Sequence, residues 1–295
     1  MPPAGEVSAT TSPEEGIWAI RRERIALTQP LLMGVLNVTP DSFSDGGQHL
    51  DPQVALQRAR EMVEEGAGMI DVGGESTRPG ARPVDPREEI ARVVPVISLL
   101  KAELSVPVSV DTRKAEVAGA ALEAGADVVN DVSALRDPAM GGVVAKSRAG
   151  LVLMHMRGTP ETMQRDPHYD DVAGEVCQEL ERALQAARDA GIREEAVVVD
   201  PGIGFAKNQE HNLQLLAQLE RLHALRRPIV VGVSRKTFIG RLLGGVAPAE
   251  RAVGTAAACV VALLKGARIF RVHDVRVARE ALTVAEAIRV ASHPA

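Results

Sequence analysis

Polar side chains follow eight short apolar runs of this sequence, and by chemistry they fall into two groups. The first group combines carboxylate, amide and ammonium side chains, those of Asp111, Asn130, Asp200 and Lys236. Carboxylates accept paired N–H donors and a lysine donates to a carbonyl, so this group suits the edge of a flat heterocycle such as a pterin or guanine. The alternative is that Asp111 and Asp200 only cap the helices that follow them, and Pro201 makes that interpretation reasonable.

The second group carries anion-binding side chains, which are Asn37, Thr77, Arg78, Arg271 and His273. Two guanidiniums, an imidazole and a hydroxyl can surround a phosphate or diphosphate, and arginine gives forked hydrogen bonds to such oxygens. The alternative is a surface ion-pair network, which is common for arginine. We expect an anion site because the valines that flank Arg271 and His273 alternate inward in the segment RVHDV.

A bound metal is expected only together with a substrate. Mg²⁺ takes one or two protein ligands when a phosphate supplies the others, so the amide of Asn37 is a candidate ligand for Mg²⁺. No His or Cys cluster has the spacing of a zinc site, and Cys177 and Cys259 each lie alone in a helical pattern. Two isolated thiols fit a reducing compartment, and we expect a cytoplasmic protein.

Two long hydrophilic loops flank these groups. Residues 37–49 (NVTPDSFSDGGQH) and residues 73–83 (GGESTRPGARP) are rich in glycine and polar residues. Long loops in barrels are usually functional or disordered, and these two are candidate lids that keep water away from a reactive intermediate. The aromatic Phe205 follows the sixth apolar run, where either a flat substrate ring or the core could pack against it.

The apolar runs alternate with amphipathic segments along the chain. The runs span residues 31–37, 69–76, 106–112, 126–133, 150–156, 196–202, 228–234 and 267–273. Two helical patterns begin with Asp51-Pro52 and Asp85-Pro86, which are N-cap signals. Eight units of about 34 residues match the length of a (β/α)₈ barrel, an α/β fold with a parallel sheet. A doubly wound open sheet is the lesser alternative, because no G-x-G-x-x-G follows the first run.

Composition excludes several classes of protein. The chain of 295 residues has 34 Lys and Arg against 39 Asp and Glu, a net charge of −5, which gives no basic excess for nucleic acid. The longest apolar stretches, such as residues 256–264, fall short of the roughly 20 residues that span a bilayer. Residues 1–16 show no apolar period and are expected to form a disordered tail before one catalytic domain of residues 17–295.

Eight motifs carry a resemblance to a known family. They are MGVLNVTPDSFSDGG (33–47), IDVGGESTRPG (70–80), VSVDTRKAEV (108–117), VVNDVSAL (128–135), LMHMRGTPETM (153–163), DPGIGFAK (200–207), GVSRKTFIG (232–240) and RVHDV (271–275). In this order they resemble the motif series of the dihydropteroate synthases. The resemblance implies a (β/α)₈ barrel, usually a homodimer. It also implies an enzyme of folate synthesis that condenses 6-hydroxymethyl-7,8-dihydropterin diphosphate with 4-aminobenzoate and is inhibited by sulfonamides.

The resemblance also implies roles for individual residues. The pterin contacts would be Asp111, Asn130, Asp200, Lys236 and Met154. The diphosphate contacts would be Asn37, Thr77, Arg78, Arg271 and His273, with Mg²⁺ on Asn37. Aminobenzoate would lie against Phe205, Pro79, Ser234 and the stem of Lys236, in a pocket that Phe43 and Asp45 help to assemble. Catalysis would depend on Asp111, Lys236, Arg271, His273 and Asp45.

The implied reaction is a dissociative C–O cleavage, in which diphosphate leaves and the amine of aminobenzoate captures a pterin-methyl cation. The sequence departs from the family at Ile203, where an aromatic residue is frequent, and at Ala206, where glycine is common. Two rival hypotheses stay open. One is a Schiff-base aldolase with Lys236 as its nucleophile, and the other is a pterin-binding relative that is non-catalytic or transfers methyl groups.

Overall fold

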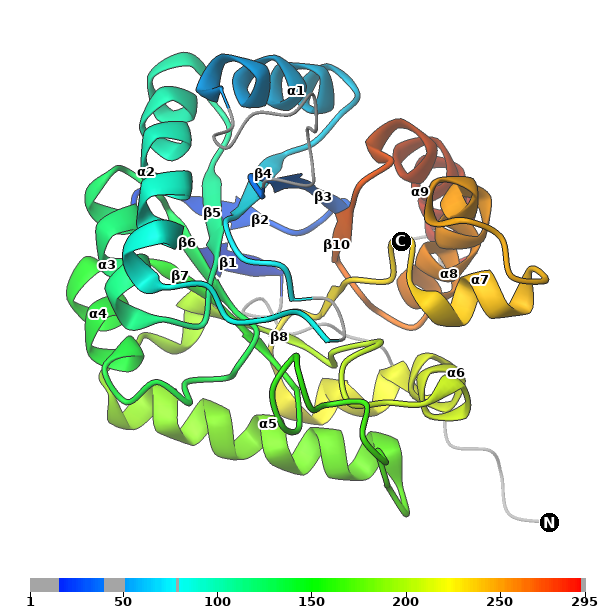
Figure 1. The fold of residues 1–295 in the computed structure, drawn as a ribbon. Helices are drawn as coiled ribbons and strands as arrows, with labels where there is room; N and C mark the ends of the chain where they lie inside the picture. The colour runs from blue at the N-terminus through cyan, green and yellow to red at the C-terminus, as the bar shows by residue number, and fades with distance from the viewer. Residues whose placement is uncertain (1–15, 40–50, 78–79, 293–295) are drawn as a thin grey trace, which may run out of the picture.

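Eight parallel strands form a ring with helices around it (Figure 1). The computed structural model describes residues 16–39, 51–77 and 80–292. The strands are β3 (Leu31–Asn37), β4 (Met69–Gly73), β5 (Val108–Asp111), β6 (Val128–Asp131), β7 (Gly150–Met154), β8 (Val197–Asp200), β9 (Val230–Val231) and β10 (Ile269–Val272). Their order is β8-β7-β6-β5-β4-β3-β10-β9, and a bridge between Val199 and Ile229 joins the two ends. The (β/α)₈ barrel is confirmed, and the open doubly wound sheet is wrong.

Each strand lies inside one of the eight apolar runs. All residues of β4, β5, β6, β7, β8 and β9 are buried, as expected for strands that pack on the barrel interior at one face and on helices at the other. The strand register sets Asn37 beside Gly73, Gly73 beside Asp111 and Asp111 beside Asn130. The polar residues that end these strands therefore form one row at the carboxyl end of the barrel.

The helices follow the predicted alternation. They are α1 (Pro52–Glu64), α2 (Pro86–Glu103), α3 (Ala115–Glu123), α4 (Met140–Ser147), α5 (Val172–Asp189), α6 (Gln209–Ala217), α7 (Thr237–Leu242), α8 (Ala252–Leu264) and α9 (Val275–Ala291), with 3₁₀ turns η2 (Glu194–Ala196), η3 (Leu219–Leu225) and η4 (Pro248–Arg251). The two N-caps are confirmed, because Asp51 accepts from the Gln53 N–H at 2.8 Å and Asp85 from the Arg87 N–H at 2.9 Å. The short helix α7 was not predicted. Among the described residues, no helix is long and apolar enough to span a bilayer.

A hairpin covers the amino-terminal end of the barrel. Strands β1 (Ile17–Ala19) and β2 (Arg24–Ala26) pair antiparallel, an element that the sequence patterns did not predict. The Trp18 side chain is fully buried, and its Nε1–H donates to the carbonyl of Ala196 at 2.9 Å. It packs with residues near the starts of the barrel strands, such as Met69 and Ile269. This end is closed, so a ligand must enter at the carboxyl ends of the strands. Most of the predicted tail, residues 1–15, lies outside the described residues.

Candidate active site

Gly73 ends β4 and lies in register between the polar residues Asn37 and Asp111. A Cβ placed on this glycine would lie 3.5 Å from Asn37 Oδ1 and 3.7 Å from Asp111 Oδ2. The two side chains therefore approach each other over a residue that has no side chain. This brings one member of each predicted group, the amide of Asn37 and the carboxylate of Asp111, to the same point in the barrel mouth.

Asp71 links the strand ends from inside the barrel. Its Oδ2 accepts hydrogen bonds from Arg271 Nε at 2.6 Å and from Asn130 Nδ2 at 3.1 Å. Arg271 Nη2 reaches Asp111 Oδ2 at 2.7 Å. The sequence patterns missed Asp71, although a fully buried carboxylate within the apolar run MIDVG is an unusual feature that could have drawn attention. Arg271 is thus forked between two buried carboxylates.

This arrangement tests the alternative that Arg271 belongs to a surface ion-pair network. The Arg271 side chain is 20 % exposed, and its partners Asp71 and Asp111 are almost inaccessible to solvent. A surface ion-pair network is therefore wrong for Arg271. The separation into an acceptor group and an anion-binding group is also too simple, because Arg271 joins the two.

Two buried carboxyl groups, those of Asp111 and Asp200, have raised pKa values. Burial raises the pKa of Asp111 to about 7, against the opposing effect of the Arg271 charge. Burial likewise raises the pKa of Asp200 to about 6. The Oδ1 atoms of Asp71 and Asp111 accept no hydrogen bond from the part of the chain that the structure describes. Buried acceptors without donors are costly, so these oxygens suit a ligand that brings N–H groups.

Asp200 holds a turn rather than a helix. Its Oδ1 accepts from the Gly202 N–H at 2.7 Å, whereas helix α6 is capped by Asn208. Helix α3 has no side-chain cap at its N-cap residue, and Asp137 bonds its first N–H. The helix-capping alternative is therefore wrong for both Asp111 and Asp200. A Cβ on Gly232 would lie 3.7 Å from Asp200 Oδ2 and 3.9 Å from Arg271 Cβ, so both side chains approach this glycine.

His273 is held by a serine. Ser234 Oγ accepts from the His273 backbone N–H at 3.1 Å and lies 3.0 Å from its Nδ1. The hydroxyl that accepts from the backbone can donate its own proton to Nδ1, which leaves Nε2–H as the outward donor. Burial and the nearby Arg271 charge lower the pKa of His273 to about 3. His273 is therefore a neutral donor at physiological pH. Ser234, a predicted aminobenzoate contact, is occupied with His273 in this structure.

An apolar cluster adjoins the acceptor row. Phe205 packs with Met154 and four other buried residues, Val132, Met156, Met163 and Ala206. The ammonium of Lys236 lies 4.0 Å from the centre of the Phe205 ring, a cation–π contact. Met154 ends β7 and is in register with Asp200 of β8, so this cluster adjoins the acceptor row.

The remaining predicted residues are divided by what the structure describes. Thr77 is half-buried four residues after the end of β4. Phe43, Asp45, Arg78 and Pro79 lie outside the described residues. Within residues 16–39, 51–77 and 80–292, no group of three His, Cys, Asp or Glu side chains could hold a metal ion. The Asn37 amide oxygen near Asp111 is the kind of single ligand that suits Mg²⁺ when phosphate oxygens complete its shell.

Comparisons with known proteins agree on one family. The model of the pterin binding enzyme family matches residues 33–273. A dihydropteroate synthase of Synechocystis is 48 % identical over 258 residues, which cover 87 % of this chain and 89 % of that protein. The crystal structure of the Yersinia pestis dihydropteroate synthase with a sulfonamide drug has a TM-score of 0.88 at 45 % identity, covering 92 % of this chain and 99 % of that one. The Xanthomonas albilineans dihydropteroate synthase with 4-aminobenzoic acid has a TM-score of 0.88 at 46 % identity, covering 93 % and 98 %.

Proposed function

Because this chain belongs to the pterin binding enzyme family, and within it to the dihydropteroate synthases, we propose that its barrel mouth is divided into pterin, diphosphate and aminobenzoate subsites. The enzyme condenses 6-hydroxymethyl-7,8-dihydropterin diphosphate with 4-aminobenzoate to 7,8-dihydropteroate, and it is a target of sulfonamides. The Schiff-base aldolase and the non-catalytic or methyl-transferring relative are therefore set aside. One observation carries the division into subsites: Asp111 offers a buried, unpaired oxygen on one side and binds Arg271 on the other.

The pterin subsite is the acceptor row. The free Oδ1 of Asp111 and the Oδ2 of Asp200 can accept N–H donors of the pterin edge, and Asn130 can both donate and accept. Lys236 would donate to the ring carbonyl, and Met154 would pack against the ring face. Binding the ring supplies the donors that the buried carboxylates lack, which favours their ionised forms.

The diphosphate subsite adjoins it at Arg271. The hydrogen bonds of Arg271 within the described chain use Nε and Nη2, so Nη1 can donate to a phosphate oxygen. His273 would add its neutral Nε2–H, and Thr77 and Arg78 would contribute from the segment after β4. The C–O bond then breaks with its electron pair leaving on diphosphate, and the pterin-methyl cation forms near the Asp111 carboxylate. The aminobenzoate amine donates its lone pair to this carbon and loses a proton.

Asn37 is the proposed protein ligand of Mg²⁺. Its amide oxygen faces Asp111 over Gly73, and the diphosphate of the substrate would supply most of the other ligands. When bound, Mg²⁺ supplies charge neutralisation to the departing diphosphate. The protein contributes the orientation of that diphosphate through Arg271 and His273.

Aminobenzoate is proposed to lie against Phe205 and the stem of Lys236. The Lys236 ammonium lies over the Phe205 ring at 4.0 Å from its centre, so the two side chains adjoin and can border one pocket together. Pro79, Ser234, Phe43 and Asp45 would complete this pocket. The loop that carries Phe43 and Asp45 is proposed to exclude water from the cation.

The assignment is tested by following diphosphate and dihydropteroate together. The purified enzyme is mixed with the dihydropterin diphosphate and Mg²⁺, with and without aminobenzoate, and a parallel sample contains a chelator. We expect both products with aminobenzoate, and slow release of diphosphate alone without it, because the cation is then captured by water. If diphosphate never leaves without aminobenzoate, the dissociative step is wrong. If the chelator changes nothing, the Mg²⁺ proposal is wrong.

We also propose a homodimer that forms through α8. This helix of 13 residues has no charged side chain, and Val253, Ala257, Val261 and Leu264 are exposed along one stripe. Val253 is 78 % exposed. An uncharged, exposed stripe on a helix is well covered by the same stripe of a second copy around a two-fold axis.

Replacing Val261 by Asp is expected to convert the dimer to a monomer, because each dimer would then bury two carboxylates. Sedimentation velocity measures the change in mass. Val54→Asp on α1 is a matched control, since Val54 is 46 % exposed and Val261 is 45 % exposed. Equal masses for the two variants would place the interface elsewhere.

A cytoplasmic location is the last part of this proposal. Cys177 and Cys259 are both free thiols, and Cys259 is fully buried. Cysteines that form no disulfide are typical of a reducing compartment.

A further inference from the structure

Lys207 is a buried lysine outside the three proposed subsites. The residue is only 2 % exposed. Its Nζ lies 3.1 Å from the carbonyl oxygen of Gly202, 3.0 Å from that of Phe205 and 3.0 Å from Nδ1 of His155. Burial lowers the pKa of Lys207 to about 7, and in the charged form its three N–H donors match these three acceptors. The lysine is therefore fully occupied with holding other groups, and it is not placed as a nucleophile.

The group that Lys207 holds is the turn between β8 and α6. Positive φ angles occur at Gly202 (68°), Gly204 (84°) and Ala206 (51°), and the last of these is unfavourable for a residue with a Cβ. A Cβ on Gly202 would also collide with the carbonyl oxygen of His155. Such a turn persists only when outside contacts fix it, and Lys207 binds the carbonyls at both of its ends.

The turn positions the Phe205 ring. Phe205 lies between two residues with positive φ, so its side-chain direction follows the turn geometry. The ring contacts the Lys236 ammonium at 4.0 Å and packs with Met154. A change in the turn would therefore tilt the ring against which aminobenzoate is proposed to lie.

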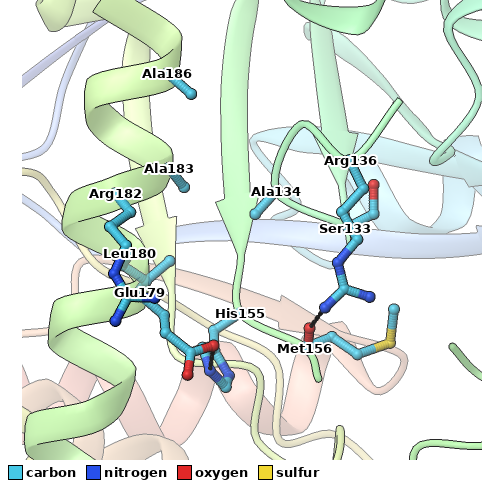
Figure 2. A pocket seen from close by; sticks show the side chains of 10 residues that line it. All are labelled: Ser133, Ala134, Arg136, His155, Met156, Glu179, Leu180, Arg182, Ala183 and Ala186. Carbon is cyan, nitrogen blue, oxygen red and sulfur yellow. Dashed lines mark hydrogen bonds and ion pairs between the residues drawn. The ribbon is translucent and has the colours of Figure 1, made fainter. Parts of the chain in front are cut away.

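His155, Glu179 and Arg157 fix the position of Lys207. His155 Nε2 lies 3.1 Å from Glu179 Oε2, and Glu179 Oε1 accepts from Arg157 Nε at 2.9 Å. Figure 2 shows the His155 and Glu179 side chains directed at each other at the edge of a pocket between α5 and the segments that follow β6 and β7. Burial lowers the pKa of His155 to about 4, so the ring is neutral. Nε2–H then donates to Glu179, and the lone pair of Nδ1 accepts from Lys207.

We propose that Lys207, supported by His155, is a positioning residue that sets the affinity of the enzyme for aminobenzoate by fixing the Gly202–Phe205 turn. This inference rests on the proposed aminobenzoate subsite at Phe205. Lys207 does not touch the substrates, and it acts through the direction of the Phe205 ring.

The test is the separation of kinetic constants in Lys207→Met. Methionine keeps the apolar stem and removes the ammonium that binds the turn. We expect the KM for aminobenzoate to rise about 10- to 100-fold, with kcat and the KM for the dihydropterin diphosphate changed by about twofold or less. Equal losses in all constants, or an unchanged KM for aminobenzoate, would overturn the proposal. Fluorescence of Trp18, which is the one tryptophan and lies at the other end of the barrel, reports folding.

A pair of substitutions at His155 tests the same role even if Lys207→Met does not fold. Asparagine carries an oxygen near the position of Nδ1 and can still accept from Lys207, whereas phenylalanine cannot. We expect His155→Phe to raise the KM for aminobenzoate as above and His155→Asn to stay within about threefold of the wild type. Equal effects of the two substitutions would overturn the role of Lys207.

Phe205→Leu distinguishes this inference from the proposed subsite. If Phe205→Leu raises the KM for aminobenzoate and Lys207→Met does not, the subsite stands and the positioning role is wrong. If neither variant changes it, aminobenzoate lies elsewhere and both proposals are wrong. If both raise it selectively, both proposals are supported.

Discussion

Replacing Arg271 by Met is expected to lower kcat/KM for the dihydropterin diphosphate by roughly 10²- to 10³-fold, the usual cost of removing one donor to a developing anion. Arg271 binds the buried carboxylates of Asp71 and Asp111, and it is the proposed contact of the diphosphate. Steady-state kinetics with the diphosphate as the varied substrate measure this loss. Both kcat and KM should worsen, because the guanidinium would bind diphosphate in the substrate and more strongly as it departs.

The same substitution is also expected to destabilise the fold by about 3–5 kcal/mol, because it leaves Asp71 and Asp111 as buried carboxylates without a cation. This loss in the free energy of unfolding should be smaller at pH 5 than at pH 8. Without Arg271 the already raised pKa of Asp111 rises further, and a carboxyl with a raised pKa costs stability as the pH increases through it. Urea titrations at the two pH values check the direction.

The double variant Asp71→Asn/Arg271→Met separates folding from function. Removing one negative charge along with the positive one should restore part of the stability, while turnover should remain low. Recovery of turnover in the double variant would show that Arg271 acts only by neutralising Asp71, and the diphosphate assignment would then be wrong.

The barrel was predictable because most residues of its strands are buried on both faces. Such strands read as apolar runs, and the runs at 31–37 and 150–156 contain β3 and β7. The N-caps Asp51 and Asp85 were predictable for a local reason, since a cap depends on residues that adjoin it in sequence. Each of these features depends on contacts or patterns within a few residues.

The unpredicted features depend on contacts between distant residues. Arg271 and Asp71 are 200 positions apart, and Lys207 and His155 are 52 apart. No periodicity encodes which of several strand-end side chains will turn toward the same buried carboxylate. The sequence patterns therefore located Arg271 near the end of a strand, and its anion-binding role stays a prediction, but they could not supply its partners.

Asp111→Asn is expected to lower kcat/KM for the dihydropterin diphosphate by about 10²-fold at pH 8 and to change its pH dependence. In the proposed mechanism the ionised carboxylate would accept the pterin N–H donors and favour the cation, whereas the amide carries no charge. Because the pKa of Asp111 in the free enzyme is about 7, the wild-type kcat/KM should rise as the pH increases through 7. In the variant, kcat/KM should no longer rise through pH 7. A weaker rise near pH 6, which belongs to Asp200, should remain.

Asp131→Asn is the matched control for this prediction. Asp131 also ends a buried strand, and burial raises its pKa as well, but its oxygens accept from Ser133 and Leu135 in the local turn. The Asp131→Asn variant should lose some stability. Its kcat/KM should still rise through pH 7, since the carboxylate of Asp131 does not face the barrel mouth. If Asp111→Asn kept the wild-type midpoint, the titrating group would be another residue and the electrostatic role of Asp111 would fail. If both variants lost the rise of kcat/KM through pH 7, the cause would be a disturbance of the barrel at the carboxyl ends of β5 and β6, because the two residues lie on these neighbouring strands.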